Sequence, residues 1–178
     1  VMQTGEIAKA NNNINGCIFA DLDVNGQRIR VYNLHLLSNN VTDLAEEVSR
    51  KGELQEKETW GKVGNMFRYY KRAAQQRVAQ AAEIAAHIEQ CPHPVLVCGD
   101  FNDVPLSFTY RLFAQKLQDS FREQGSGLGT TYAGNIPWLR IDYILAGQQA
   151  TFLAHDVLTP SPNYSAHYPV WAQVEWGE

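Results

Sequence analysis

The chain has 178 residues, a formal net charge of −4 at pH 7 and 44% hydrophobic residues, which suffice for one domain with a sizeable core but hardly for two. The mild acidity argues against nucleic-acid binding that depends on charge alone, because such binding requires clustered lysine and arginine. Cys17, Cys91 and Cys98 match neither a zinc site nor a disulfide framework by their spacing. The sequence shows no signal peptide, transmembrane span or lipidation motif.

The N-terminal part of the chain predicts a polar start and then a β-hairpin. Residues 1–15 are polar and show no strand pattern. Residues 18–36 contain strand-like runs on both sides of Asn25-Gly26, which is the strongest short signal for a hairpin turn. Alternation along the second strand gives one face with Ile29, Val31, Asn33 and His35, and an opposite face with Arg30, Tyr32, Leu34 and Leu36.

Helices are predicted on both sides of a short buried strand. Residues 43–56 could form a short helix, because its first turn has the spacing of a capping box. Residues 67–89 have small apolar residues at helical spacing and are followed by prolines, so they predict the clearest helix. Residues 95–98 predict the buried strand, and residues 105–117 predict a further helix with Ser107 as its cap.

The C-terminal half predicts short strands separated by loops. A turn or loop is expected at residues 125–129, and strands are expected at residues 130–132, 139–145, 151–157 and 168–176. Because strands and helices do not alternate regularly, the pattern disfavours a doubly wound parallel sheet. We therefore expect an α/β (α+β) fold in which two largely antiparallel sheets pack together with helices outside.

The buried strand ends in a polar stretch, Gly99-Asp100-Phe101-Asn102. If the strand keeps its pleat, Asp100 and Asn102 point to the same side, and Gly99 permits a close approach of the backbone. Aspartate and asparagine also begin many loops, so an ordinary loop start explains the pair equally well.

Three other stretches bring polar side chains to the ends of apolar strands. His35 ends one strand, and His167 precedes the last strand. Asp142 lies among apolar residues, with Arg140 on the same face by alternation. Each residue has a structural explanation on its own, but a carboxylate among apolar neighbours is costly unless it is paired. Together with Asp100, these residues predict one shared polar pocket.

Such a pocket suits the hydrolysis of phosphate esters. A carboxylate can align and deprotonate water, and an imidazole can act as acid or base near neutral pH. An amide and a guanidinium can hold phosphate oxygens. A divalent metal would neutralise charge in the transition state, and Mg²⁺ needs only one or two carboxylates from the protein.

Four motifs give the chain a resemblance to a known family. In chain order they are VYNLHL, CGDFNDVP, RIDYIL and SAHYPV. From about residue 18 to residue 176 the chain closely resembles the endonuclease/exonuclease/phosphatase superfamily, the DNase I-like metal-dependent phosphoesterases. The resemblance implies a single domain over residues 1–178, folded as a four-layer sandwich of two largely antiparallel sheets flanked by helices. It also implies a hydrolase of phosphodiester or phosphomonoester bonds that uses Mg²⁺ or Mn²⁺, with nucleic acid among the candidate substrates.

The resemblance assigns roles to five residues. Asp100 resembles the carboxylate that orients the attacking water, and Asn102 the amide that binds the phosphate and steadies that carboxylate. His167 resembles the histidine that contacts the scissile phosphate, and Asp142 the carboxylate paired with it. His35 resembles the histidine that helps to hold the phosphate or to protonate the leaving group. From strand alternation, we add Arg140 and Asn33 as candidate phosphate contacts.

The chain also departs from the family pattern. Ser165-Ala166-His167 stands where the family usually has Ser-Asp-His, and alanine cannot bind the metal that this aspartate commonly helps to hold. Ala166 is either natural divergence or an inactivating substitution. An asparagine and a glutamate that the family places near the start of the domain have no counterpart in residues 1–18. We therefore expect a fold that lacks its N-terminal strands, metal ligands that stay unassigned, and weak or no hydrolysis by this polypeptide.

Two alternatives remain open at this stage. Aromatic and basic residues interleave between Trp60 and Arg72, which suits base stacking and phosphate contacts, although a helix with its aromatics packed inward explains them better. The chain could also be a non-catalytic family member that binds a phosphorylated ligand or a protein partner. An aspartate at position 166 and a glutamate upstream in the parent gene would favour the enzyme, and a native alanine without that glutamate would favour the binding protein.

Overall fold

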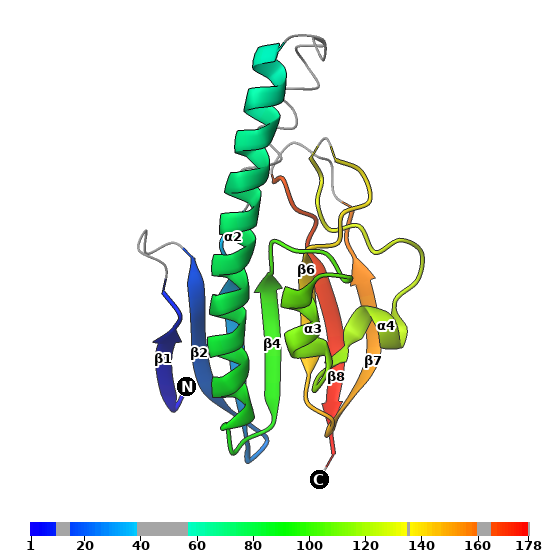
Figure 1. The fold of residues 1–178 in the computed structure, drawn as a ribbon. Coiled ribbons are helices and arrows are strands. Elements are labelled where there is room, and N and C mark those ends of the chain that lie inside the picture. Colours follow the sequence, from blue (N-terminus) through cyan, green and yellow to red (C-terminus); the bar gives the residue numbers. More distant parts are fainter. Residues whose placement is uncertain (10–14, 39–56, 135, 160–164, 178) are drawn as a thin grey trace.

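The computed structural model describes residues 1–9, 15–38, 57–134, 136–159 and 165–177 (Figure 1). The helix predicted for residues 43–56 lies outside these described residues. The described part of the chain forms an α/β fold with a six-stranded mixed sheet, a two-stranded sheet and three helices. None of the helices in this part is long and apolar enough to span a membrane.

The larger sheet has the strand order β1-β2-β3-β4-β6-β5. These strands are β1 (Gln3–Ile7), β2 (Gly16–Val24), β3 (Gln27–His35), β4 (Val95–Asp100), β5 (Gln118–Asp119) and β6 (Asp142–Ala146). Only the pair β3–β4 is parallel, and the other neighbours are antiparallel. The smaller sheet is an antiparallel pair of β7 (Ala150–Val157) and β8 (Val170–Trp176). The expectation of largely antiparallel sheets is confirmed for these strands, apart from the one parallel pair.

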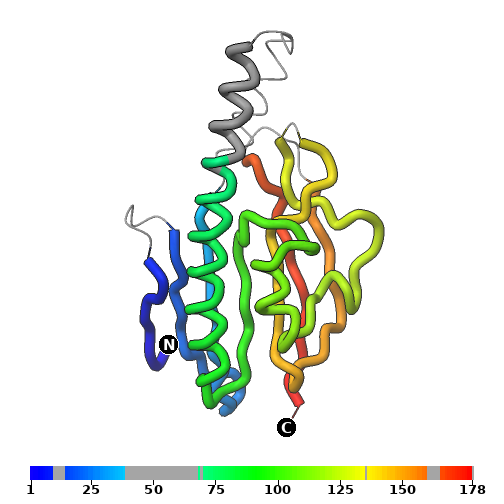
Figure 2. Tube along the Cα trace, viewed as in Figure 1, coloured from blue at the N-terminus to red at the C-terminus, as the bar shows by residue number. Residues whose placement is uncertain are grey.

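The two faces of the larger sheet have different neighbours. The helices α2 (Lys57–Glu89) and α3 (Phe108–Ala114) pack on one face, where Tyr143 and Leu145 of β6 join the main core (Figures 1 and 2). The intervening Ile144 and Ala146 belong to a second, smaller cluster with residues of β7 and β8. Helices, larger sheet and smaller sheet therefore follow one another as layers, and α4 (Ser120–Gln124) lies beside β7.

Local sequence signals explain several of these elements. The hairpin β2–β3 turns at Asn25 and Gly26, which both have positive φ angles, 54° and 87°. The predicted faces of β3 are confirmed at its C-terminal end, because Tyr32 and Leu34 are buried whereas Asn33 and His35 are exposed. The Ser107 side chain accepts a hydrogen bond from the backbone N–H of Tyr110, which confirms the predicted cap of α3.

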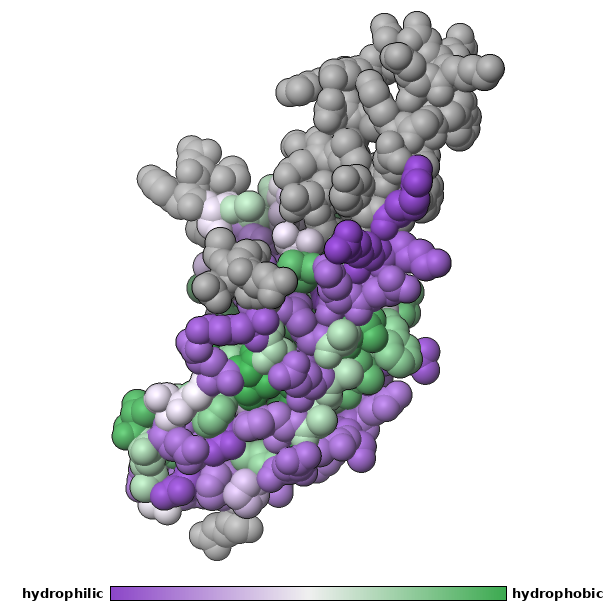
Figure 3. Space-filling model, turned by 60° about the vertical axis from the view of Figure 1, so that its left-hand side comes forward, coloured by the Kyte–Doolittle hydropathy of each residue, from purple (hydrophilic) through white to green (hydrophobic). Residues whose placement is uncertain are grey.

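Other predictions about the elements are corrected. The polar residues 1–15 include strand β1, which pairs with β2 at the edge of the sheet. An edge strand needs no apolar face, so its pattern carries little signal, and polar residues there discourage pairing with other chains. Figure 3, which brings this side of the molecule forward, shows small apolar patches separated by hydrophilic residues.

Element boundaries also shift. The long helix begins at Lys57 instead of residue 67, and α3 is shorter than the predicted 105–117. The strand predicted at 130–132 reduces to a single bridge between Tyr132 and His167. The short elements β5 and α4 were not predicted, because two and five residues give too little periodicity to detect.

Candidate active site

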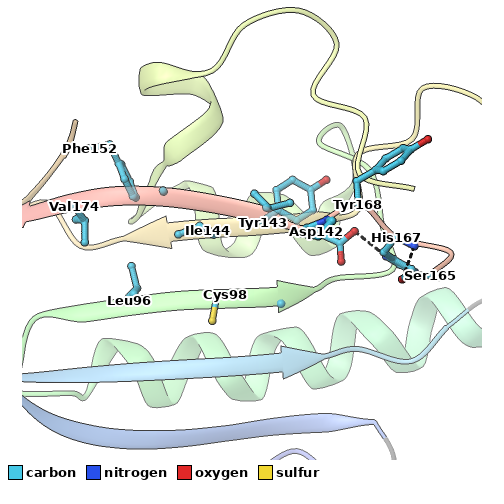
Figure 4. Close-up of a pocket in the computed structure, with 14 residues that line it drawn as sticks. Leu96, Cys98, Asp142, Tyr143, Ile144, Phe152, Ser165, His167, Tyr168 and Val174 are labelled. Atoms are coloured by element: carbon cyan, nitrogen blue, oxygen red, sulfur yellow. Dashed lines mark hydrogen bonds and ion pairs between the residues drawn. The ribbon is translucent and has the colours of Figure 1, made fainter. Parts of the chain in front are cut away.

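Three neighbouring strands place polar side chains at one edge of the larger sheet. The parallel strands β3 and β4 end together, with His35 opposite Asp100. The antiparallel strand β6 begins there, with Asp142 opposite Asp100 on the other side. His167 joins them from the segment before β8, where Figure 4 shows it beside Asp142. The structure thus brings together the four strand-end residues that the sequence predicted to share a pocket.

Asp142 and His167 form a close pair. The imidazole Nδ1 of His167 lies 2.9 Å from Oδ2 of Asp142, and both side chains are partly buried. The hydrogen bond to Asp142 is the main cause that raises the pKa of His167 above its ordinary value, although burial opposes it. The ring of Tyr132 packs edge-on against the imidazole, with centroids 5.6 Å apart. The pair therefore fixes the orientation of the imidazole and favours its protonated form.

Asp100 is held by Asn102. The backbone N–H of Asn102 donates to Oδ1 of Asp100 at 2.7 Å, and its side-chain amide donates to Oδ2 at 2.9 Å. The same amide nitrogen donates to the carbonyl of Leu36 at 2.9 Å. Burial raises the pKa of Asp100, and the carboxylate of Asp142 raises it further. A carboxylate with a raised pKa and a fixed orientation is suited to accept a proton from water.

His35 lies next to this carboxylate but is more open to solvent. Its Nε2 is 3.7 Å from Oδ2 of Asp100, and its side chain is 47% exposed. At this distance the imidazole and the carboxylate are neighbours without a direct hydrogen bond. The exposed ring can therefore contact a ligand that binds over the group.

Gly99 permits the close approach of β3 and β4 that positions His35. Its φ is +134°, and a Cβ atom built at this position would lie 1.9 Å from the carbonyl oxygen of Leu34. Only glycine avoids both the unfavourable backbone angle and the clash. The sequence prediction of a close backbone approach at this residue is confirmed.

The structure corrects the prediction that Arg140 lies in the polar pocket. Its guanidinium is buried and donates to both carboxylate oxygens of Asp119, at 3.1 and 2.8 Å. The rings of Phe121 and Tyr143 lie within 4.7 Å of its Cζ. The alternation failed because β6 begins only at Asp142, so the pleat does not extend back to Arg140.

Asn33 lies near the group but not in it. Its side chain is exposed on β3, two residues before His35, and it pairs with Cys98 instead of Asp100. Ser165 also belongs to this group, although it is not among the predicted site residues. Its hydroxyl accepts a hydrogen bond from the backbone N–H of His167 at 3.0 Å, and a serine two residues before a candidate histidine is a detectable turn signal.

Part of this group could hold a metal ion. One ligand atom from each of Asp100, Asp142 and His167 lies within 4.8 Å of the others, among the described residues. Mg²⁺ prefers oxygen ligands and commonly takes one or two carboxylates, with water and substrate oxygens completing its shell. The two carboxylates fit this requirement, whereas Ala166, which directly precedes His167, offers no side-chain ligand.

A hollow of about 640 Å³ extends from the polar group between the two sheets. Asp142, Ser165 and His167 lie at one end, and the hollow continues past Cys98 to Leu96, as Figure 4 shows. Most of the residues beyond the polar end are apolar and come from β4, β6 and β8. The site therefore joins a polar, charged end to an apolar space inside the fold.

Comparisons with known proteins agree with this architecture. A family model described as Endonuclease/Exonuclease/phosphatase family matches residues 9–172. The mannosyl-6-phosphatase Bt3783 of Bacteroides thetaiotaomicron is similar with a TM-score of 0.67 and 16% identity, over 99% of this chain and 67% of that protein. The human Nocturnin catalytic domain with bound sulfate anion gives 0.63 and 19%, over 98% of this chain and 58% of that domain.

A third similar structure is a humanized TDP2 of D. rerio, with a TM-score of 0.62 and 14% identity, over 97% of this chain and 66% of that protein. At these identities the likeness shows the fold alone. The chain spans about two thirds or less of the length of these structures. No curated protein matches the chain significantly.

Proposed function

The chain belongs to the endonuclease/exonuclease/phosphatase family, and from this premise we propose that its polar group is a site for metal-dependent hydrolysis of a phosphate ester. The observation that supports the proposal most directly is the placement of Asp100 beside the Asp142–His167 pair at one sheet edge. A carboxylate next to an oriented imidazole supplies the two functions that hydrolysis requires, activation of water and stabilisation of the phosphate.

In the proposed reaction, Asp100 aligns the attacking water and accepts its proton. Its raised pKa makes it a better base than a solvent-exposed aspartate, and Asn102 keeps its oxygens in place. Because the amide of Asn102 is already occupied by Asp100 and Leu36, we assign it a positioning role first. A direct contact of Asn102 with phosphate would require one of these hydrogen bonds to open.

The proposed role of His167 is to bind and stabilise the phosphate that is attacked. Asp142 accepts a hydrogen bond from Nδ1, which leaves Nε2 to donate to a phosphate oxygen. His35 lies on the other side of Asp100 and is exposed, so we propose that it holds the phosphate or protonates the leaving group. Asn33 remains a candidate contact for a larger substrate, since it lies on the same face of β3.

Mg²⁺ or Mn²⁺ would supply charge neutralisation when bound, with Asp142 as its first proposed carboxylate ligand, since Asp100 is assigned the role of base. Because Ala166 adds no ligand, we expect weak metal affinity and slow hydrolysis by this polypeptide. A phosphodiester or a phosphomonoester fits the proposal, and the similarity to the Bacteroides mannosyl-6-phosphatase makes a monoester the first substrate class to test.

The proposal is tested by restoring a carboxylate at position 166. Ala166→Asp should increase kcat/KM for p-nitrophenyl phosphate or its bis-ester by about tenfold or more in the presence of Mg²⁺ or Mn²⁺, because a further ligand tightens metal binding. Ala166→Asn, which has nearly the same size but no charge, is the matched control and should give a much smaller effect. EDTA should abolish the difference.

Two results would contradict parts of the proposal. Robust turnover by the unaltered chain with either metal would overturn the expectation of slow hydrolysis. No turnover in Ala166→Asp, together with tight binding of phosphate that His167→Ala abolishes, would support the alternative of a non-catalytic protein that binds phosphorylated ligands.

A further inference from the structure

Thr131 occupies a junction behind the candidate active site. It is 1% exposed and belongs to no helix or strand. Its hydroxyl oxygen accepts hydrogen bonds from two consecutive backbone N–H groups, that of Ile141 at 3.0 Å and that of Asp142 at 3.1 Å. One side chain therefore holds the backbone from which the Asp142 carboxylate projects.

These two N–H groups need such an acceptor because the sheet is incomplete at this point. On one side, β6 pairs with β4, where Asp142 lies opposite Asp100. On the other side, β5 pairs with β6 only at Leu145 and Ala146 and does not reach the first residues of the strand. Buried N–H groups without a partner are costly, so the hydroxyl of Thr131 takes the place of a strand neighbour.

The backbone of Thr131 connects the same point to the segment that carries His167. Its carbonyl accepts a hydrogen bond from the N–H of Tyr168 at 2.7 Å, and its N–H donates to the carbonyl of Leu139 at 2.9 Å. Tyr132 forms an isolated bridge with His167. Thr131 is thus bonded to Asp142 itself and to Tyr168, the residue that follows His167.

A further bond extends this arrangement to Asp100. The carbonyl of Ile141 accepts from the N–H of Phe101 at 2.9 Å, while the N–H of Ile141 is the one held by Thr131. The segments that supply Asp142 and His167 are therefore bonded directly to Thr131. The segment that supplies Asp100 is linked to Thr131 through Ile141.

We propose that Thr131 is a positioning residue that sets the Asp142 carboxylate and the His167 imidazole in register. Its importance for catalysis rests on the proposed function, whereas its effect on the geometry of the pair does not. Small displacements of catalytic groups can reduce rates by about a hundredfold, so a hydroxyl that touches no substrate can still control turnover.

The test compares three single variants of the full chain. Thr131→Val keeps the shape but removes the acceptor, and Thr131→Ser keeps the acceptor. Thr109→Val is the matched control, because Thr109 is equally buried and its hydroxyl has no hydrogen-bond partner within the described residues. The first readout is the proton NMR signal of the hydrogen-bonded imidazole N–H of His167 at one fixed pH, assigned by its loss in His167→Gln.

We expect Thr131→Val to lose or shift this signal and to speed amide exchange at Ile141 and Asp142, while Thr131→Ser and Thr109→Val retain the values of the unaltered protein. An unchanged signal in a folded Thr131→Val variant would overturn the proposal. If that variant does not fold, rapid amide exchange at Ile141 and Asp142 in the unaltered protein would overturn it as well.

Hydrolysis provides a separate readout. In the Ala166→Asp background, Thr131→Val should lower kcat by roughly tenfold to a hundredfold with little change in KM, as expected for misplaced catalytic groups. If no background shows hydrolysis, the proposed function fails, but the NMR comparison still decides whether Thr131 positions the pair.

Discussion

At the scale of single residues, Gly99 combines two constraints that a side chain cannot meet. Its φ of +134° is unfavourable for other residues, and a Cβ would lie 1.9 Å from the Leu34 carbonyl oxygen. We expect Gly99→Ala to lower the free energy of unfolding by about 3 kcal/mol or more, since backbone strain and overpacking each cost about 1–3 kcal/mol. Urea denaturation measures the change.

Gly26 offers a matched control for this substitution. Its φ is also positive, at +87°, but an added Cβ would meet no atom within 4 Å. Gly26→Ala should therefore cost only about 1 kcal/mol, the strain of the backbone angle alone. Equal losses in the two variants would show that the contact with β3 is not what makes glycine necessary at position 99.

Single residues also show what the sequence could and could not predict. Asp100, Asp142, His35 and His167 were predictable because each lies at the end of an apolar strand, where a polar side chain needs an explanation. The partner of Arg140 was not predictable from the sequence. Its bond to Asp119 depends on the pairing of β5 with β6, which are distant in sequence. Thr131 falls within the strand predicted at residues 130–132, and nothing in the neighbouring sequence indicates that its hydroxyl binds the backbone of Ile141 and Asp142.

At the scale of elements, the reliable predictions were those with a local physical cause. The hairpin turn needs only Asn25-Gly26, and the start of α3 needs only the Ser107 hydroxyl. Strand β1 has no such signal, because its partner β2 supplies the hydrogen bonds and little of its surface is buried. The family motifs pointed to the residues of the candidate site, but the parallel pairing of β3 with β4 appears only in the structure.

The contact between α4 and β7 predicts a response to acid. His155 of β7 bonds through Nδ1 to the Ser120 hydroxyl at 2.8 Å, and its Nε2 is buried without a partner among the described residues. Burial lowers the pKa of His155 below its usual 6.5, so the unfolded chain binds a proton more readily than the folded chain. The contribution to stability should therefore be full above pH 6.5 and decrease as the pH falls through the lowered folded-state pKa.

Urea denaturation between pH 7.5 and pH 5 checks this expectation. The unaltered protein should lose free energy of unfolding relative to His155→Gln as the pH falls, by at most about 1.4 kcal/mol per pH unit. Parallel pH profiles of the two proteins would contradict the assignment, because other histidines titrate in both of them.

At the scale of the whole molecule, the two faces of the larger sheet are unequally covered. The helix side of the larger sheet is a packed core, whereas the hollow of about 640 Å³ on its other side is lined mainly by apolar residues such as Leu96, Ile144 and Val174. The hollow lies between the two sheets, so the smaller sheet covers this face of the larger sheet only incompletely.

An exposed apolar hollow should bind a hydrophobic dye in the native state. We expect the folded chain at neutral pH to enhance the fluorescence of ANS, because the dye reports accessible apolar surface. Ile144→Lys, which places a charge in the hollow, should reduce the signal, whereas the same substitution at the exposed Leu106 should not. Absence of ANS binding by the unaltered chain would show that the hollow is closed in solution.

The parallel pairing of β3 with β4 also sets the order in which the site can assemble. The hairpin β2–β3 closes over a two-residue turn. Strand β4 begins only at Val95 and is separated from β3 in the sequence by a long segment that includes α2. Such a long loop closes slowly compared with a hairpin, and contacts between distant residues form late in folding. We therefore expect His35 to join a folded strand before Asp100 pairs beside it, and recovery of any hydrolytic activity during refolding should lag behind formation of the hairpin.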